Sequence, residues 1–338
     1  MVPFSSLTTS ITSMLTSIAP AIVAATIALP GGPPVAMDYL AIDRVNDRLW
    51  VPSGNTGAIN VIDLPAGKVR TLTGLPTRPA SHGGRPNRGM MGPSSVAIGR
   101  DTVWVGNRGD DALCAFDART LARGACVKLA SMPDGLAFVA GTGELWATTP
   151  RDGTLTIVGT RGGFAAPVTL RLDGEPEGYA VDEGRGRFYT NLEDKDRTVA
   201  VDVKTRKVVA SWPTGCGAEG PRGLVLDDKR QLLFSACTSG AVAMDVAHGG
   251  AAVGRIETGG GVDNLDYDAA RGLLFVASPR DGTLTVARVG KTGTLTAVAV
   301  VPTAKGARNP VVDARGTAYV ADSPAGRIIV VPLPAGAR

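Results

Sequence analysis

Histidine is nearly absent from this chain, which has only two, His82 and His248, among its 338 residues. The sequence also has no CxxC pair and no HExxH motif, so a zinc site is not expected. Lys and Arg nowhere form a run interleaved with aromatic residues, and the formal net charge is only +4. Nucleic-acid binding is therefore not indicated.

Long apolar segments are absent as well. No stretch reaches the roughly 18 apolar residues that a membrane-spanning helix needs. The start of the chain is rich in Ser and Thr, and its first basic residue is Arg44, so it lacks the positively charged front end of a signal peptide. We therefore expect no membrane span, and we interpret residues 1–20 as an N-terminal extension or the stub of a targeting segment.

The sequence does contain an internal repeat. The heptapeptide PRDGTLT occurs at Pro150 and again at Pro279, an offset of 129 residues, or three times 43. Periods of roughly 20 to 50 residues are typical of repeat folds. Seven copies of one unit can be recognised, and their first strands open at Asp38, Ser94, Asp134, Glu177, Arg222, Asp263 and Arg308.

Each copy contains four short β-rich segments joined by Gly, Asp, Asn and Pro turns, with no helical periodicity between them. One such unit cannot bury both of its faces, whereas units stacked around an axis can. We predict an all-β fold, a seven-bladed β-propeller with four antiparallel strands per blade, over residues 21–338. The heptapeptide is then the hairpin between second and third strands, in which Asp152-Gly153 and Asp281-Gly282 tolerate positive φ.

The last copy is one strand short, because the chain ends soon after the segment RIIVVP. The segment from Ile22 to Gly32 leads into the first copy as fourth strands lead into later copies. We expect this N-terminal strand to complete the last blade and close the ring. One second-strand position is aromatic in every copy, which predicts packing between blades: Trp50, Trp104, Trp146, Tyr189, Phe234, Phe275 and Tyr319.

The four cysteines fall into two local pairs. Cys114 lies in a third strand and Cys126 in the fourth strand of the same copy, about opposite each other. Cys216 precedes a first strand, and Cys237 ends the second strand of that copy. We predict two disulfides, and hence an oxidising compartment, with buried thiols as the alternative.

Four stretches resemble one known family. They are CGAEGPRGLVLDDKRQLLFSAC, GGGVDNLDYDAARGLLFVASPRDGTLTV, KGARNPVVD and DYLAIDRVNDRLWVPSGNTGAINVIDLPAGKV, and they are similar to the YncE-type YVTN-repeat proteins. The resemblance covers roughly residues 22–334. It implies a seven-bladed propeller of a kind that bacteria usually export and that mostly has no assigned reaction. We therefore expect a periplasmic or secreted protein.

The first strands of a propeller are innermost, so their opening residues should ring one mouth of the central channel. These are the seven residues from Asp38 to Arg308 given above, with four acids, two bases and Ser94. We predict a ligand-binding site at this channel mouth. The alternative is a structural ring, in which Arg222 and Arg308 bridge the carboxylates across blades.

The hairpins between second and third strands should form a rim around the same mouth. Its predicted members are Asn107, Arg108, Arg151, Asn191, Glu193, Asp194, Arg280 and Asp322. An insert between the first two copies, Thr77 to Met90, is predicted as an irregular loop. It adds Arg78, His82, Arg85 and Arg88 as potential anion contacts.

The sequence favours an exported binding or scaffold protein, a monomer without cofactor or metal, whose ligand is an unknown small molecule or protein. It leaves open whether the protein is an enzyme.

A lactonase-like propeller would hold Ca²⁺ through Asp38, Asp134, Glu177, Asp263 and Asn191, although Arg222 and Arg308 would oppose the cation. A propeller of the streptogramin-lyase type needs a channel histidine. No first strand opens with one, and His248 belongs to a hairpin on the opposite face, which leaves His82.

Overall fold

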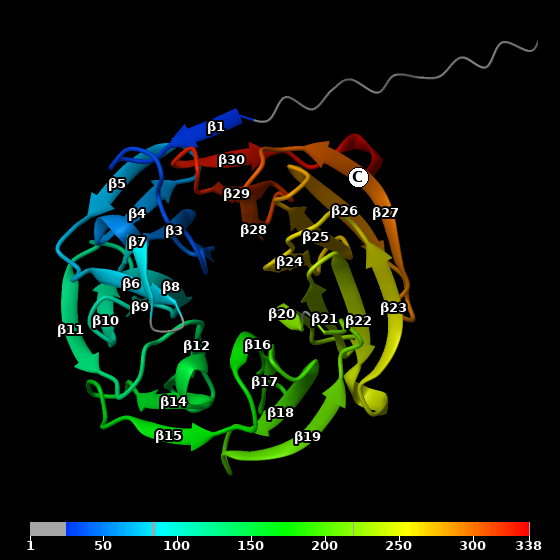
Figure 1. The fold of residues 1–338 in the computed structure, drawn as a ribbon, viewed down its shortest axis with the longest axis horizontal. Helices are drawn as coiled ribbons and strands as arrows, with labels where there is room; N and C mark the ends of the chain where they lie inside the picture. Colours follow the sequence, from blue (N-terminus) through cyan, green and yellow to red (C-terminus); the bar gives the residue numbers. More distant parts are fainter. Residues whose placement is uncertain (1–24, 83–84, 219, 338) are drawn as a thin grey trace, which may run out of the picture.

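Seven sheets stand around a central axis in the computed structural model, which describes residues 25–82, 85–218 and 220–337 (Figure 1). Each of the seven sheets has four strands, and all strand pairs within them are antiparallel. The helical elements of the described residues are short 3-10 turns: η1 (Gly54–Thr56), η2 (Pro150–Asp152), η3 (Val246–His248) and η4 (Ala335–Ala337). The prediction of an all-β, seven-bladed propeller with four antiparallel strands per blade is confirmed.

The first four blades follow one another along the chain. Blade 1 has β2 (Ala41–Asp43), β3 (Arg48–Ser53), β4 (Ala58–Asp63) and β5 (Lys68–Leu72). Blade 2 has β8 (Pro93–Ile98), β9 (Thr102–Asn107), β10 (Ala112–Asp117) and β11 (Arg123–Lys128). Blade 3 has β12 (Leu136–Val139), β13 (Glu144–Thr149), β14 (Thr154–Gly159) and β15 (Val168–Arg171). Blade 4 has β16 (Pro176–Asp182), β17 (Arg187–Leu192), β18 (Arg197–Asp202) and β19 (Lys207–Pro213).

The remaining three blades complete the circle. Blade 5 has β20 (Pro221–Asp227), β21 (Leu232–Cys237), β22 (Gly240–Asp245) and β23 (Ala251–Glu257). Blade 6 has β24 (Leu265–Asp268), β25 (Leu273–Ser278), β26 (Thr283–Val289) and β27 (Leu295–Pro302). Blade 7 has β28 (Ala307–Val312), β29 (Ala318–Asp322), β30 (Arg327–Val331) and, as its outermost strand, β1 (Ala25–Ala28).

The outermost strand of blade 7 comes from the other end of the chain. β1 pairs with β30, with Ala25 opposite Val330 and Ala28 opposite Arg327. Figure 1 shows it lying outside β30. The start of the predicted closing segment, Ile22 to Ala24, and the predicted extension at residues 1–20 lie outside the described residues.

The repeated heptapeptide forms a tight turn in both copies. Pro150 to Asp152 make up η2 between β13 and β14, and Gly153 follows with φ of 62°. Gly282 has φ of 67° at the equivalent position between β25 and β26. These left-handed conformations explain why both copies keep a glycine there.

Buried apolar side chains form seven clusters, and each cluster joins the facing sides of two neighbouring blades. The aromatic second-strand residues lie inside these clusters. Trp104 stacks on Phe138 of the next blade with ring centroids 4.5 Å apart, and Trp146 stacks on Phe188 at 5.0 Å. The predicted packing between blades is confirmed, and the core of the protein is a ring of interfaces around the channel.

The insert between blades 1 and 2 is not the irregular loop that we predicted. It forms an antiparallel hairpin, in which β6 (Arg78–His82) pairs with β7 (Arg85–Met91). Arg78 donates to both carboxylate oxygens of Asp111, at 2.7 and 2.8 Å, so its guanidinium is engaged in an ion pair rather than free for an anion. The side chains of His82, Arg85 and Arg88 lie outside the described part of the structure.

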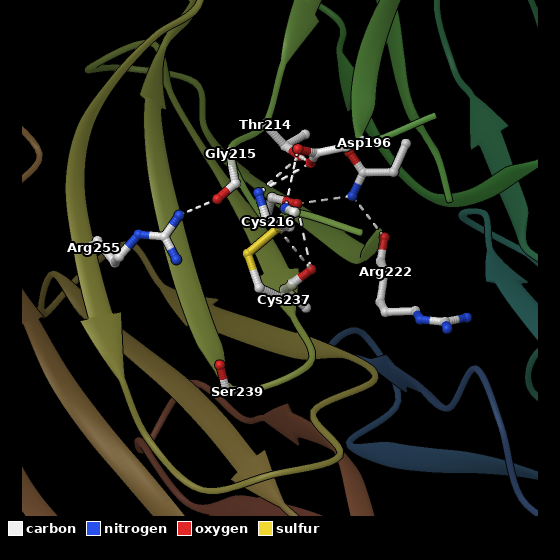
Figure 2. The surroundings of a disulfide bond; sticks show 12 residues. Asp196, Thr214, Gly215, Cys216, Arg222, Cys237, Ser239 and Arg255 are labelled. Carbon is white, nitrogen blue, oxygen red and sulfur yellow. Dashed lines mark hydrogen bonds between the residues drawn. A yellow bond between two sulfur atoms is a disulfide. The ribbon is translucent and has the colours of Figure 1, made fainter. Parts of the chain in front are cut away.

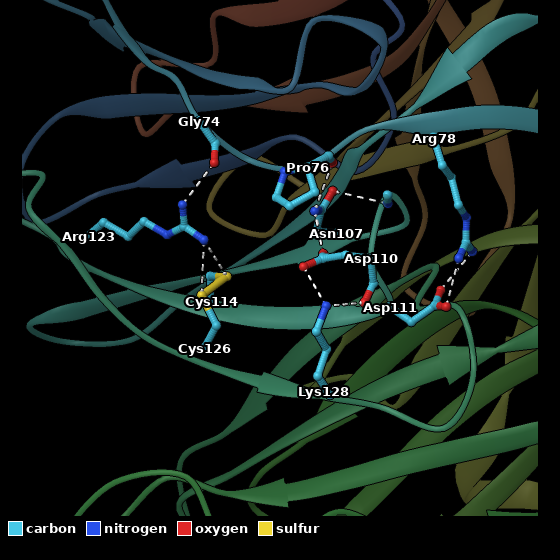
Figure 3. Close-up of polar contacts among 11 residues, drawn as sticks. Gly74, Pro76, Arg78, Asn107, Asp110, Asp111, Cys114, Arg123, Cys126 and Lys128 are labelled. Atoms are coloured by element: carbon cyan, nitrogen blue, oxygen red, sulfur yellow. Dashed lines mark hydrogen bonds and ion pairs between the residues drawn. A yellow bond between two sulfur atoms is a disulfide. The ribbon is translucent and has the colours of Figure 1, made fainter.

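Both predicted disulfides are present. Cys114 and Cys126 are directly opposite each other in β10 and β11, beside the guanidinium of Arg123 (Figure 3). Cys216 is bonded to Cys237 across 21 positions of sequence, and a closed loop of this length contributes roughly 3 kcal/mol to stability. Figure 2 shows the Asp196 carboxylate above this bond, where it accepts the backbone N–H of Cys216 at 3.0 Å.

The described residues contain no helix that is both long and apolar enough to cross a membrane.

Candidate functional site

An arginine of blade 2 connects two of the predicted mouth acids. Arg108 follows β9 and donates through Nη2 to Asp38 Oδ2 at 2.8 Å. The same nitrogen contacts Asp134 Oδ1, so Arg108 links blades 1 and 3 through blade 2. The sequence placed Arg108 on the rim, and the structure places its guanidinium within the ring of first-strand residues.

Two further arginines neutralise acids on the other side of the mouth. Arg308 of blade 7 donates to Asp263 of blade 6 at 2.8 Å. Arg222 of blade 5 pairs with Glu193 of blade 4, which the sequence placed on the rim. Asn309, next to Arg308, donates through Nδ2 to Asp38 Oδ1 at 3.2 Å. These contacts join blades to one another, as in the structural-ring alternative.

Glu177 differs from the other acids of the mouth, because its carboxylate makes no hydrogen bond or ion pair with the described residues. The pKa of Glu177 rises from 4.5 to about 8. Burial is the main cause, and the nearby charges of Glu193, Asp263 and Asp38 add to it, whereas Arg108 opposes the rise. We therefore expect Glu177 to carry a proton at neutral pH, as a hydrogen-bonding group without a partner among the described residues.

Three hollows adjoin the mouth. The basin, of about 690 Å³, is lined by Glu175, Glu193, Asp194, Ala218, Arg222, Thr238, Gly261, Val262, Asp263, Arg280 and Arg308. The inner cavity, of about 270 Å³, lies along the first strands, and its polar lining includes Asp38, Tyr39, Arg44, Tyr179, Asn264, Asp266 and Asn309. A smaller hairpin hollow, of about 120 Å³, lies where Met90 and Met91 approach Asp38, Ser94 and Arg108.

Two tyrosines meet in the channel. Tyr39 belongs to blade 1 and Tyr179 to blade 4, yet their ring centroids are only 5.7 Å apart. The central gap between the ribbons of Figure 1 is therefore crossed by side chains at this level. The pKa of Tyr39 is raised well above 10, first by burial and then by the negative charges of Glu177, Asp38 and Asp263.

Several predicted site residues are buried inside the blades and do not reach the rim. Asn107 donates to Pro76 O at 3.0 Å and to Asp110 Oδ1 at 2.6 Å (Figure 3). Asn191 donates to Arg222 O at 2.7 Å and to Ser235 Oγ at 3.0 Å, and its Oδ1 accepts from Thr198. Asp322 is also buried and pairs with Arg327. Ser94 is buried as well, but it lines the hairpin hollow.

Three other described rim residues lie near the mouth. Glu193, Asp194 and Arg280 line the basin. Arg280 is exposed, and Asp194 accepts the backbone N–H of Glu175 at 2.7 Å. Arg151 is exposed at η2. The structure thus brings part of the predicted rim together with the mouth on the side of blades 4 to 7.

Sequence reasoning missed Tyr39, Tyr179 and Asn309. A signal existed for Tyr179, which follows Glu177 by two residues, the spacing that puts two side chains on one face of a strand. Asn309 has φ of 54°, a left-handed conformation that Asn tolerates more readily than most residues. In this conformation both Arg308 and Asn309 reach the mouth. The alternation of side chains along a regular strand does not predict it.

A pH dependence of stability follows from Glu177. Since the folded-state pKa of about 8 lies above the ordinary 4.5, the protonated carboxyl favours folding. This contribution is fully present below about pH 4.5 and is lost as the pH rises through 8. Glu177→Gln remains neutral, so urea unfolding between pH 5 and 9 should show a smaller loss of stability for the variant than for the wild type.

Glu175→Gln is the matched control for this experiment, because it is the same change at an exposed acid two positions earlier. Its stability should fall with pH as in the wild type. Parallel pH curves for all three proteins would show that Glu177 is not protonated in the folded state at neutral pH.

Comparison with known proteins supports the fold. No protein-family model and no curated protein matches the chain. Among solved structures, virginiamycin B lyase from Staphylococcus aureus superposes with a TM-score of 0.72 at 11% identity, over 93% of this chain and 100% of that chain. A chain in the crystal structure of a mitotic checkpoint complex gives 0.73 at 11% identity, over 98% and 99%. A streptogramin B lyase gives 0.72 at 10% identity, over 93% and 98%. At such identities the similarity shows a shared propeller architecture.

Proposed function

We propose that this protein is an exported binding or scaffold propeller of the YncE/YVTN type, with its ligand held at the channel mouth. The observation that carries the proposal is the unpartnered carboxyl of Glu177, whose charged neighbours Glu193 and Asp263 line a basin of about 690 Å³. A ring that served only to join the blades would gain nothing from an acid without a counter-charge, since burying such a group costs free energy. A ligand that contacts Glu177 would offset that cost.

Two features support export. Both disulfides are of the kind that persists in oxidising compartments such as the periplasm or the exterior of the cell. The resemblance of the repeat units to YVTN proteins, which bacteria usually export, points the same way. We propose a periplasmic or secreted location on these grounds.

The binding function can be tested by native mass spectrometry of the purified protein. We expect the wild type to retain a small molecule that denaturation releases and that can then be identified. Glu177→Gln and Arg222→Ala should lose it, because both residues face the mouth. Lys229→Ala removes an exposed charge in the turn after β20, at the other end of the first strands, and should retain it. Equal retention by all variants would place the ligand elsewhere and leave the mouth a structural ring.

An enzyme acting at the same mouth is the second candidate, because a carboxyl with a pKa of about 8 suits general acid-base catalysis near neutral pH. A lactonase-like site with Ca²⁺ is less well supported. Asp38, Asp134 and Asp263 pair with arginines, and Asn191 is buried in its own network. Within the described residues, no three His, Cys, Asp or Glu side chains are grouped to hold a metal. Stoichiometric Ca²⁺ in the purified protein would favour the enzyme.

A further inference from the structure

The charges at the mouth do not balance. Five carboxylates belong to it, and three guanidinium groups face them. Every one of these guanidinium groups already contacts a carboxylate, Arg108 contacting two. A negatively charged ligand would have to displace one of these pairs or bind Arg280 at the exposed edge of the basin, whereas a positively charged ligand would meet an acid that is still unpaired.

The surroundings of the unpaired acid include aromatic rings. Burial is the main cause of the raised pKa of Tyr39, and the negative charges of Glu177, Asp38 and Asp263 add to it, so all three acids lie near that side chain. Tyr39 is only 8% exposed, and its ring lies 5.7 Å from that of Tyr179. Carboxylates beside the faces and edges of tyrosine rings form the combination that attracts organic cations.

A second, independent feature is a buried hydrogen-bond acceptor, on Asn309, that has no donor. Asn309 is 2% exposed and lines the inner cavity. Its Nδ2 is directed to Asp38, but its Oδ1 is buried without any hydrogen-bond partner. A buried amide oxygen without a donor costs about 1–3 kcal/mol. The inner cavity is therefore short of donors, and an ammonium group supplies up to three.

We infer that the mouth takes a ligand with an organic ammonium group, which binds the Glu177 carboxylate beside the Tyr39 and Tyr179 rings. The inference rests on the proposed binding function and narrows it to one chemical class. It distinguishes the ligand from a carboxylate or phosphate, which would instead bind the engaged arginines or the exposed Arg280 at the edge of the basin.

The same surroundings favour an organic cation over a metal ion. Ca²⁺ takes six to eight oxygen ligands at roughly 2.3–2.6 Å. Most of the mouth carboxylates are held by Arg108, Arg222 and Arg308 and would have to leave them. An ammonium group needs one carboxylate and a few further acceptors, and Glu177 provides that carboxylate without breaking an ion pair.

Binding should release a proton. Glu177 faces Asp38 of blade 1, Glu193 of its own blade and Asp263 of blade 6, which repel its charge, and Arg108 of blade 2, which favours it. Arg308 of blade 7 also favours the charge of Glu177, although its ion-pair partner is Asp263. Arg222 is paired with Glu193. An ammonium group beside Glu177 would lower its pKa, so the protonated carboxyl would give its proton to the buffer as the ion pair forms.

Three probes with a similar short alkyl chain and different functional groups test this class of ligand: butylamine, 1-butanol and butyrate. Aliphatic amines remain protonated at pH 7. Ligand-observed NMR titration of the full chain at pH 7 should show butylamine binding at least tenfold more tightly than the alcohol or the acid. Calorimetry in two buffers of different protonation enthalpy should show release of about one proton per butylamine, given the pKa of about 8.

Glu177→Gln, which keeps the size and removes the charge, should weaken butylamine binding at least tenfold and abolish proton release. Asp228→Asn, the same kind of change at an exposed acid in the turn after β20, away from the mouth, should change the affinity less than twofold. The inference is overturned if butylamine does not bind, if Glu177→Gln binds it as the wild type does, or if 1-butanol or Ca²⁺ competes with it equally. If the protein binds butyrate and Arg222→Ala abolishes that binding, the ligand is not an ammonium compound, but the mouth is still a binding site. The proposed binding function is tested separately, by retention of a native ligand.

Discussion

Replacing Phe188 with alanine is expected to lower the free energy of unfolding by about 3–5 kcal/mol. Phe188 is fully buried in β17, at the interface between blades 3 and 4. Its ring stacks on Trp146 of blade 3 with centroids 5.0 Å apart and on Tyr179 with centroids 6.2 Å apart. The cavity left by the variant would open inside one of the seven interfaces that hold the ring together.

Urea unfolding followed by circular dichroism measures this loss, and Phe164→Ala is its control. Phe164 is half-buried in the turn after β14, so its truncation should cost about 1 kcal/mol. Equal losses for the two variants would show that the interfaces between blades contribute no more than the periphery. That result would contradict a ring held together by packing between neighbours.

The repeat could be read from sequence because its physical cause is local and periodic. Each unit must turn at fixed places, so glycines such as Gly153 and Gly282 recur with the period. Each unit must also pack on its neighbour, so an aromatic recurs at the position of Trp50 and Trp146. The blades, their order and the disulfide pairs follow from these constraints.

The hairpin of β6 and β7 was missed although a signal for it exists. His82 and Arg85 are partners in the pairing register, and Gly83-Gly84 stands between them in sequence, a dipeptide typical of two-residue hairpins. Pro79 and Pro86 obscure the signal, because proline normally argues against a strand. The strands β6 and β7 form a two-stranded sheet of their own, where the missing N–H groups are tolerated.

The mouth could be predicted only in part, because long side chains cross between blades. The equivalent positions of Asp38, Asp134 and Glu177 in their first strands predict that all three lie at the mouth, because the backbone position alone determines where a first strand begins. It could not show that Arg108, from a turn of the second blade, reaches the first two and leaves the third unpaired. Such a difference depends on side-chain reach and competition for partners, which a repeat pattern does not encode.

The bridge made by Arg108 carries the second large effect. Arg108→Ala is expected to lower the free energy of unfolding by about 3 kcal/mol, since it leaves the buried carboxylate of Asp134 without a counter-charge and removes one from the half-buried Asp38. Asp134 is only 5% exposed, and the Arg108 side chain is 22% exposed. Lys128→Ala, in the same blade, breaks a more exposed pair with Asp110 and should cost less than about 1 kcal/mol (Figure 3).

A double variant separates the ion pair from simple packing. Arg108→Met with Asp134→Asn keeps similar volumes and removes one of the stranded charges, so it should recover part of the stability that Arg108→Ala loses. Because Arg108 also lowers the pKa of Glu177, Arg108→Ala should raise that pKa above 8, which NMR of the carboxyl carbon can follow. An unchanged Glu177 titration together with a small stability loss would mean that Arg108 does not lie between the acids. If both effects appear, one guanidinium determines which acid of the mouth remains available to a ligand.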